Sequence, residues 1–427
     1  MNEVARLSAA EAAALIAAGR LKSEALVEAC LGEIAQREPV VHAWQHVARE
    51  RALAEARRRD REAPRGPLHG VPFGVKDIIA VEGMPIGFGT PIFDGCVSPR
   101  DAACVALLEE AGAVCLGKTV TTELAHFAPG ATSNPHDSAR TPGGSSSGSA
   151  AAVAADMVPL AFGTQTTGSM IRPSAFCGVV GYKPTYGDFS VSGVYSCAKS
   201  FDTVGVAAKS VDDLPLVRSA VMRQPIRAPR ERLPAQLAIG VYRTPMWDSA
   251  DGSARNALEL AAARLENAGA QVHAFDLPDE FAEVLALHRV AAAFEFARAV
   301  TWERVNHGDR LSEVLMSGRV AEGLTVTLES YYASLDELSR LRARFVACFG
   351  KLDCLLTLAA PGEAPVGLHA TGSPLFNTTW TALYTPAITI PVMRGEHGMP
   401  VGIQLIGLPR ADDALFEVAR CIGRAIS

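Results

Sequence analysis

Apolar strand-like runs alternate with amphipathic helical patterns along the whole chain, and this alternation constrains the fold more than any single motif. Runs such as VPLAFG, LAIGVYR and QVHAFDLP are separated by helical patterns such as ARNALELAAARLENAGA. No linker-like stretch or internal repeat interrupts the series. The pattern predicts an α/β fold, a single large domain with a mixed β-sheet covered by helices on both faces.

Composition and charge limit the classes of partner. The chain has 427 residues, of which 48% are hydrophobic, so a sizeable core can form. Its formal net charge of −6 argues against nucleic acid or an anionic membrane as the main partner. The basic cluster at residues 57–61 alternates with acids and alanines, which predicts a solvated helix face rather than a binding patch.

Several features predict a soluble cytoplasmic protein. No stretch reaches the roughly 18 to 20 uncharged apolar residues that a membrane span requires. The N-terminus MNEVARLSAAEAAALIAAGR carries charges where a signal peptide has its apolar region. The nine cysteines include no Cys-x-x-Cys pair, which indicates reduced thiols.

Two short motifs match known patterns but have the wrong context. GAVCLGKT, residues 112–119, matches a phosphate-binding loop, yet its middle residues predict a buried strand. GSSSG, residues 144–148, matches a nucleophile elbow, yet TPGG precedes it instead of an apolar strand. The ten histidines show no metal-ligand spacing, so no metal site is expected. His69 and His126 are interpreted as structural, with His126 the next candidate for a base.

Three separated segments carry residues suited to acyl transfer: GVPFGVKD with Lys76, PGGSSSGSAAA with Ser145, and TQTTGSMIRP with Ser169. This reaction needs an activated nucleophile, a base and a pocket that stabilises an anion. Lys76 lies in a mostly apolar strand pattern, where burial would lower the pKa of its amine. A serine hydroxyl both donates and accepts, so Ser145 can relay a proton between Lys76 and Ser169.

The stretch PGGSSSGSAAAVAADMVPLAFGTQTTGSMIRPSAFCGVVGYKPT resembles the amidase signature family, whose members hydrolyse amides with a Ser–cis-Ser–Lys triad. GVPFGVKDII, FDTVG and PAITIPVMRGEHGMPVGIQLIGLPRADDALF match as well, so the resemblance covers nearly the whole chain. It implies that Lys76 is the base, Ser145 the cis-serine relay and Ser169 the nucleophile. It also implies an oxyanion hole of backbone N–H groups, which belong to Thr166, Thr167 and Gly168.

The turn before Ser169 departs from the Asp-x-Gly-Gly-Ser sequence of many members. Gln165 removes a charge, and Thr167 restricts the backbone angles. The sequence Gly-Thr-Gln-Thr-x-Gly-Ser-x-Ile-Arg-Pro resembles the malonamidase-like branch of the family, where the arginine at the place of Arg172 holds the substrate's free carboxylate. A structural role for Arg172, in which its planar fork ties the turn to neighbouring carbonyls, is the open alternative.

The resemblance implies an amidase that converts a small carboxylic amide to acid and ammonia through an acyl-serine intermediate, without metal or cofactor. A malonamate-like acid-amide is the finer expectation. The alternatives are a non-catalytic binding protein on the same fold and a glutamyl-tRNA amidotransferase A-type subunit. The expected partner is a small-molecule amide, with no nucleic acid and no membrane, and a homodimer remains open.

The single domain, residues 1–427, is expected to contain four regions. Residues 1–65 form N-terminal helices, the first of which is capped by Ser8 and Glu11. Residues 66–215 form the catalytic core. Residues 225–375 are variable and shape the substrate pocket, and residues 376–427 supply core strands and a helix.

Overall fold

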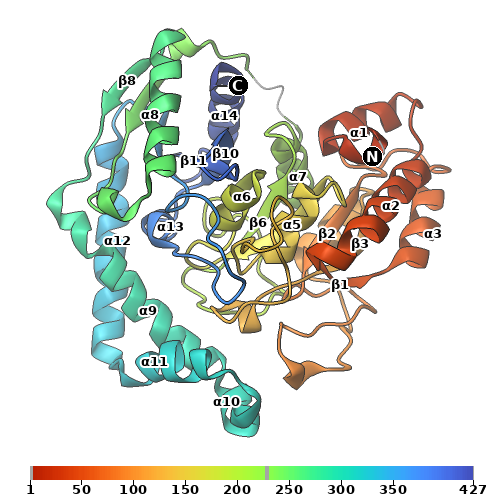
Figure 1. Cartoon of the computed structure of the whole chain (residues 1–427), viewed down its shortest axis with the longest axis horizontal. Coiled ribbons are helices and arrows are strands. Elements are labelled where there is room, and N and C mark those ends of the chain that lie inside the picture. Colours follow the sequence, from red (N-terminus) through yellow and green to blue (C-terminus); the bar gives the residue numbers. More distant parts are fainter. Residues whose placement is uncertain (1–2, 227–229, 427) are drawn as a thin grey trace.

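A mixed sheet of eleven strands runs through the centre of the molecule (Figure 1). The computed structural model describes residues 3–226 and 230–426. The strand order is β1-β3-β2-β4-β6-β5-β10-β11-β9-β7-β8. The strands are β1 Trp44–Val47, β2 Pro72–Lys76, β3 Val114–Thr119, β4 Leu160–Gln165, β5 Val180–Lys183, β6 Thr203–Ala208, β7 Ala238–Val241, β8 Gln271–Ala274, β9 Cys354–Leu358, β10 Ala387–Arg394 and β11 Pro400–Ile406.

Helices cover this sheet, which confirms the predicted α/β architecture. Helices α1 to α3 lie at one end of the molecule and α8 to α12 at the other (Figure 1). The α-helices are α1 Ala9–Ala17, α2 Ser23–Val41, α3 Arg49–Arg59, α4 Ala103–Glu110, α5 Ser147–Ala154, α6 Ile171–Cys177, α7 Asp213–Met222, α8 Gly252–Asn267, α9 Val284–Ala299, α10 Thr301–His307, α11 Ala321–Thr325, α12 Leu328–Phe349, α13 Leu375–Ala382 and α14 Asp412–Ile426. No helix of the described ranges is long and apolar enough to cross a membrane.

The sheet brings the three candidate segments together. Strand β2 pairs in parallel with β3 on one side and with β4 on the other. Lys76 ends β2, whereas Gln165 ends β4 directly before the turn that carries Ser169. The rejected phosphate-loop motif contains β3, as its apolar residues predict.

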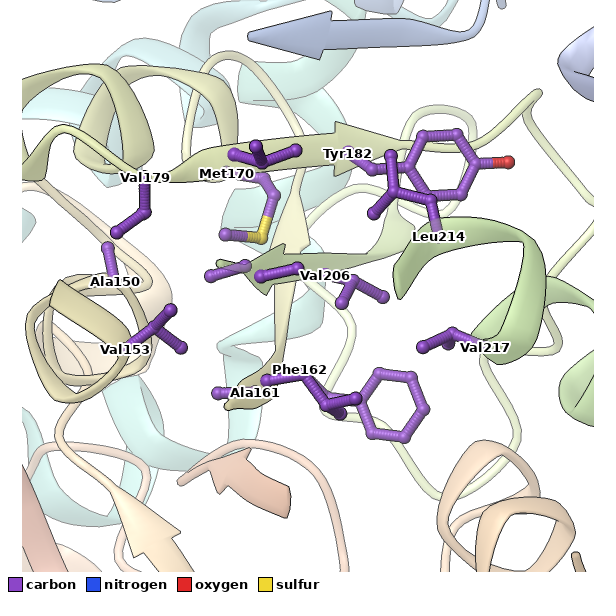
Figure 2. Close-up of a cluster of buried hydrophobic side chains, with 14 of the residues drawn as sticks. Ala150, Val153, Ala161, Phe162, Met170, Val179, Tyr182, Val206, Leu214 and Val217 are labelled. Carbon is purple, nitrogen blue, oxygen red and sulfur yellow. The ribbon is translucent and has the colours of Figure 1, made fainter. Parts of the chain in front are cut away.

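Helix α5 packs close to the sheet because its residues are small. Figure 2 shows Ala150 and Val153 of α5 on one side of β4 and β6, with Leu214 and Val217 of α7 on the other. A Cβ at Gly148 would lie 2.2 Å from the Ala43 carbonyl oxygen, so only glycine allows this approach. The serines that precede this helix are therefore held firmly against the sheet.

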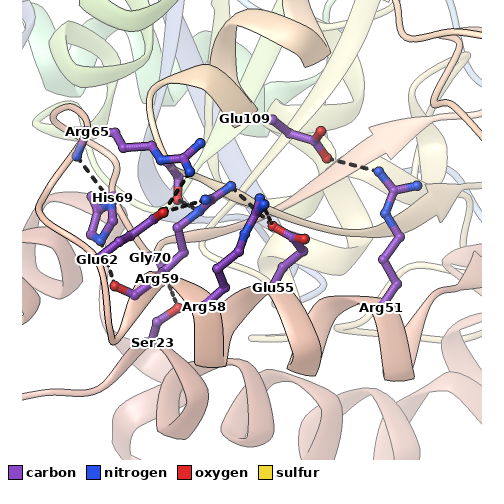
Figure 3. A network of polar contacts seen from close by, with 11 residues as sticks. Ser23, Arg51, Glu55, Arg58, Arg59, Glu62, Arg65, His69, Gly70 and Glu109 are labelled. Atoms are coloured by element: carbon purple, nitrogen blue, oxygen red, sulfur yellow. Dashed lines mark hydrogen bonds and ion pairs between the residues drawn. The ribbon is translucent and has the colours of Figure 1, made fainter.

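The N-terminal basic cluster forms ion pairs, and one of its members is not solvated as predicted. Arg58 pairs with Glu55 on the exposed side of α3. Arg59 is buried, donates to the Gly112 carbonyl and pairs with Glu62 (Figure 3). The prediction was wrong for Arg59 because Gly112, which precedes β3, supplies an acceptor that the local helix pattern does not reveal. His69 Nε2 forms a hydrogen bond with the Arg59 carbonyl oxygen, which is a structural role.

Candidate active site

Lys76 is fully buried at the end of β2 and contacts two hydroxyl groups. Its Nζ lies 2.6 Å from Ser145 Oγ and 2.8 Å from Thr164 Oγ1. Burial lowers the pKa of the Lys76 amine from its ordinary value near 10.5 to about 7, although Cys197 and Asp202 act in the opposite direction. A substantial neutral fraction is therefore present near neutral pH, as a base requires.

Asp77, the next residue in the chain, pairs with Lys118 and not with Lys76. Asp77 Oδ1 lies 2.9 Å from Lys118 Nζ on β3, and both side chains are buried. The other Asp77 oxygen accepts from the Gly87 N–H. Asp77 is therefore engaged away from Lys76, and no carboxylate of the described residues forms an ion pair with Lys76.

Of the three consecutive serines, only Ser145 contacts Lys76. The Gly144–Ser145 peptide bond is cis, as the family's term for this serine implies. Ser146 Oγ donates to the Thr164 carbonyl and accepts from the Thr164 N–H. Ser147 begins α5 and donates to the Val120 carbonyl. Ser146 and Ser147 therefore attach the loop to its surroundings, and Ser145 is the one of the three serines that lies beside the lysine.

The turn between β4 and α6 presents backbone donors beside Ser169. Among the described residues, no acceptor bonds to the N–H groups of Thr166, Thr167, Gly168 or Ser169. Thr167 does not adopt a positive φ, so its side chain is compatible with this turn. A Cβ at Gly168 would lie 2.5 Å from Asn377 Oδ1, which explains the glycine. The turn thus offers unpaired N–H groups where an oxyanion could bind.

Side chains at the start of the turn and in a more distant segment hold this turn in place. Gln165 Oε1 accepts from the N–H groups of Met170 and Ile171, at 2.9 and 3.0 Å. Gln165, at the place where many family members have an acid, therefore serves as an acceptor at the start of α6. Thr166 Oγ1 donates to Asp202 Oδ1 at 2.6 Å.

Two more side chains bind the carbonyls of the turn. His288 Nε2 lies 2.9 Å from the Thr166 carbonyl oxygen, to which it donates, and Thr381 Oγ1 donates to the Thr167 carbonyl at 2.8 Å. Sequence reasoning assigned no role to Asp202, His288 or Thr381. Asp202 lies in the quoted FDTVG motif, whereas His288 and Thr381 lie in segments without a distinctive local signal.

A cavity of about 50 Å³ joins most of the predicted site residues. Ser145, Ser169, Thr166, Thr167 and Arg172 all line it. Lys76 and Gly168 are not among its lining residues, and Lys76 is linked to it through Ser145. The remaining lining residues are mainly apolar or basic and comprise Ala125, His126, Phe127, Cys197, Ala198, Ala292, Phe296, Arg319 and Pro374.

Arg172 combines a structural contact with unused donors. Its side chain is buried, and Nη2 donates to the Gly144 carbonyl at 2.6 Å and to Thr371 Oγ1 at 3.2 Å. Its Nε and Nη1 atoms are buried without a partner in the described residues. Burial lowers the pKa of the guanidinium, which still remains charged at neutral pH.

His126, the next candidate for a base, is poorly suited to that role. Burial and the nearby Arg319 lower the pKa of His126 to about 3. Such a weakly basic imidazole provides little driving force for removing a serine proton. Within the described ranges, no group of three or more His, Cys, Asp or Glu residues is arranged to hold a metal ion.

Comparisons with known proteins identify the family. A family model described as Amidase matches residues 25–416. The chain is 34% identical to the A-type subunit of the glutamyl-tRNA(Gln) amidotransferase of Anaeromyxobacter sp. (strain K), over 100% of this chain and 97% of that protein.

Two solved structures superpose over nearly all of both chains. One is from a vestigial protein complex that reveals the evolutionary origins of an s-triazine catabolic enzyme, with TM-score 0.88, 30% identity and 98% coverage of each chain. The other is the native peptide amidase from Stenotrophomonas maltophilia, with TM-score 0.85, 29% identity, and coverage of 99% of this chain and 98% of that chain. The chain therefore belongs to the amidase signature family, whose members hydrolyse carbon–nitrogen amide bonds.

Proposed function

We propose that this amidase converts a small primary amide to an acid and ammonia, with Ser169 as the nucleophile. One observation carries the proposal: unpaired N–H groups surround Ser169 in the same cavity as Ser145, which contacts the buried Lys76. Nucleophile, proton relay, base and oxyanion donors are the parts that acyl transfer requires.

In the proposed mechanism, neutral Lys76 accepts a proton from Ser145 as Ser145 accepts the proton of Ser169. The Ser169 oxygen attacks the amide carbon, and the oxyanion binds the N–H groups of Thr166, Thr167, Gly168 and Ser169. Lys76 returns the proton through Ser145 to the leaving nitrogen, so the C–N bond breaks and ammonia departs. Water then attacks the acyl-Ser169 ester by the same relay, which releases the acid and restores the serine.

Arg172 supports the finer proposal that the substrate bears a free carboxylate. Its Nε and Nη1 atoms have no partner, so each can donate a charge-assisted hydrogen bond to a carboxylate oxygen. A malonamate-like acid-amide carries such a free carboxylate.

The second candidate is an A-type subunit of a glutamyl-tRNA amidotransferase, in which glutamine would supply the ammonia. The comparisons favour this candidate over the malonamate-like one, because the relatives at 31–34% identity carry that name. That function would require partner subunits, and it would bring RNA into the assembly despite the acidic net charge. The family membership supports an enzyme, so the non-catalytic alternative has no support.

Ammonia release by the purified chain tests the proposal. Malonamate, succinamate, glutamine and neutral propionamide form the substrate panel, and Ser169→Ala is the matched inactive control. Release of ammonia by the wild type alone supports the amidase mechanism. Release from glutamine only, and only with added partner subunits, would support the second candidate. Equal release by wild type and Ser169→Ala would contradict the role of Ser169.

A further inference from the structure

The cavity beside Ser169 is cationic. Arg172 and Arg319 both line it, whereas none of its described lining residues is Asp or Glu. Asp202, which contacts the lining residue Thr166, accepts from Thr166, Ser196 and two backbone N–H groups. No free carboxylate in this lining can therefore balance a positively charged group on a substrate.

His126, which lines this cavity, has an unused neutral donor. Arg319 Nε donates to His126 Nε2 at 3.4 Å, which leaves the proton of the neutral ring on Nδ1. His126 Nδ1 is buried and has no hydrogen-bond partner in the described residues. The ring stacks on Phe296 with centroids 4.6 Å apart, which fixes its plane.

Arg319 lies where the cavity meets a wider groove. The groove measures about 890 Å³ and shares four lining residues with the cavity, namely Phe127, Thr167, Arg319 and Pro374. In this groove Glu322 pairs with both Arg319 and Arg289, so its charge is already engaged. A substrate that enters through the groove would pass Arg319 before it reaches Ser169.

We propose that this site discriminates against amides that carry an ammonium group, and that His126 Nδ1 binds a second acceptor oxygen of the substrate. The carboxylate of the substrate would bind Arg172, as the proposed function already assigns. An ammonium group would lose its water beside two guanidinium groups without gaining an acid, which is unfavourable at short range. The inference rests on the proposed amidase function and separates acid-amides from amino-acid amides such as glutamine.

Matched substrate pairs test the charge selection. Glutaramate and glutamine differ only in the α-ammonium group, as do succinamate and asparagine. We expect kcat/KM to be about 10-fold or more higher for the member without the ammonium group. Arg319→Glu should reduce that preference to about threefold or less, whereas the uncharged Arg319→Gln should give an intermediate value. Equal kcat/KM within each wild-type pair would overturn the inference.

Two substitutions test the donor role of His126. His126→Phe keeps a ring against Phe296 and removes the donor, whereas His126→Asn keeps an N–H donor near the place of Nδ1. We expect about a tenfold or larger loss of kcat/KM on glutaramate for His126→Phe and a smaller loss for His126→Asn. Equal losses in both variants at unchanged Tm would assign His126 to packing.

Binding to Ser169→Ala separates failure of the inference from failure of the proposed function. Titration calorimetry would compare glutaramate with glutamine on this variant. Tighter binding of glutaramate without wild-type turnover would contradict the amidase proposal and support the charge selection. Turnover of both amides without a preference would support the amidase proposal and contradict the charge selection. Absence of both binding and turnover would overturn both proposals.

Discussion

At the residue scale, the protonation state of Lys76 decides whether the proposed chemistry can begin. The amine must be neutral to accept a proton, and burial lowers its pKa to about 7. The neutral fraction rises with pH, so kcat/KM should rise through about pH 7 and level off above it. With a solvated lysine, the rise of kcat/KM would instead occur near pH 10.

Lys76→Met tests whether Lys76 is the base, because methionine has a side chain of similar length but no basic group. We expect a loss of about 10²-fold or more in kcat/KM, since this is the usual contribution of a general base. Circular dichroism and Tm would show that the variant is folded. A loss of only a few-fold would mean that another group removes the proton.

Arg172 has two contacts that hold the fold and two nitrogens that are free for a ligand. We expect Arg172→Met to lose about 2 kcal/mol or more of transition-state stabilisation on succinamate and less on its methyl ester. Arg172→Lys, which retains a charge, should lose less on succinamate than Arg172→Met. Equal losses on both substrates, or a fall in Tm that explains them, would leave Arg172 with a purely structural role.

At the element scale, the turn between β4 and α6 depends on side chains that sequence reasoning interpreted only in part. The sequence indicates only that Gln165 removes the charge of an acid. In the structure, however, it accepts hydrogen bonds from two N–H groups at the start of α6. Asp202, His288 and Thr381 act on the same turn from distant parts of the chain. Their roles depend on tertiary contacts with single backbone or hydroxyl groups, and such contacts leave no periodic pattern in a sequence.

Gln165→Ala should therefore disturb the oxyanion donors without removing them. We expect kcat to fall by about 10-fold or more with a small change in KM, because the donors act mainly in the transition state. Gln165→Glu keeps the acceptor oxygen and should lose less than Gln165→Ala. Stopped-time ammonia assays would measure both, and an increase in KM at constant kcat would contradict the interpretation.

At the scale of the whole molecule, the alternating pattern predicts the sheet and its helices but not the order of its strands. Strands β10 and β11 come last in the chain, yet they lie between β5 and β9 in the sheet. They join the strands of residues 66–215 to β7, β8 and β9. Strand order depends on which edges meet in three dimensions, and a local hydrophobic pattern carries no information about that choice.

The shared sheet predicts one unfolding transition for the whole chain. Far-UV circular dichroism and tryptophan fluorescence should give coincident denaturant midpoints, because β10 and β11 link both parts of the sheet. Removal of residues 376–427 should abolish the cooperative transition, since it removes both linking strands. Two well-separated midpoints in the full chain would contradict this expectation.

The identity of the acylated residue decides whether the proposed mechanism holds. The purified wild type would be treated with a fluorophosphonate, digested and analysed by tandem mass spectrometry, with Ser169→Ala and Lys76→Met as controls. We predict a label on Ser169 in the wild type, no label at this position in Ser169→Ala, and a much slower reaction in Lys76→Met. A label on Ser145 or Ser146 with Ser169 unmodified would contradict the mechanism.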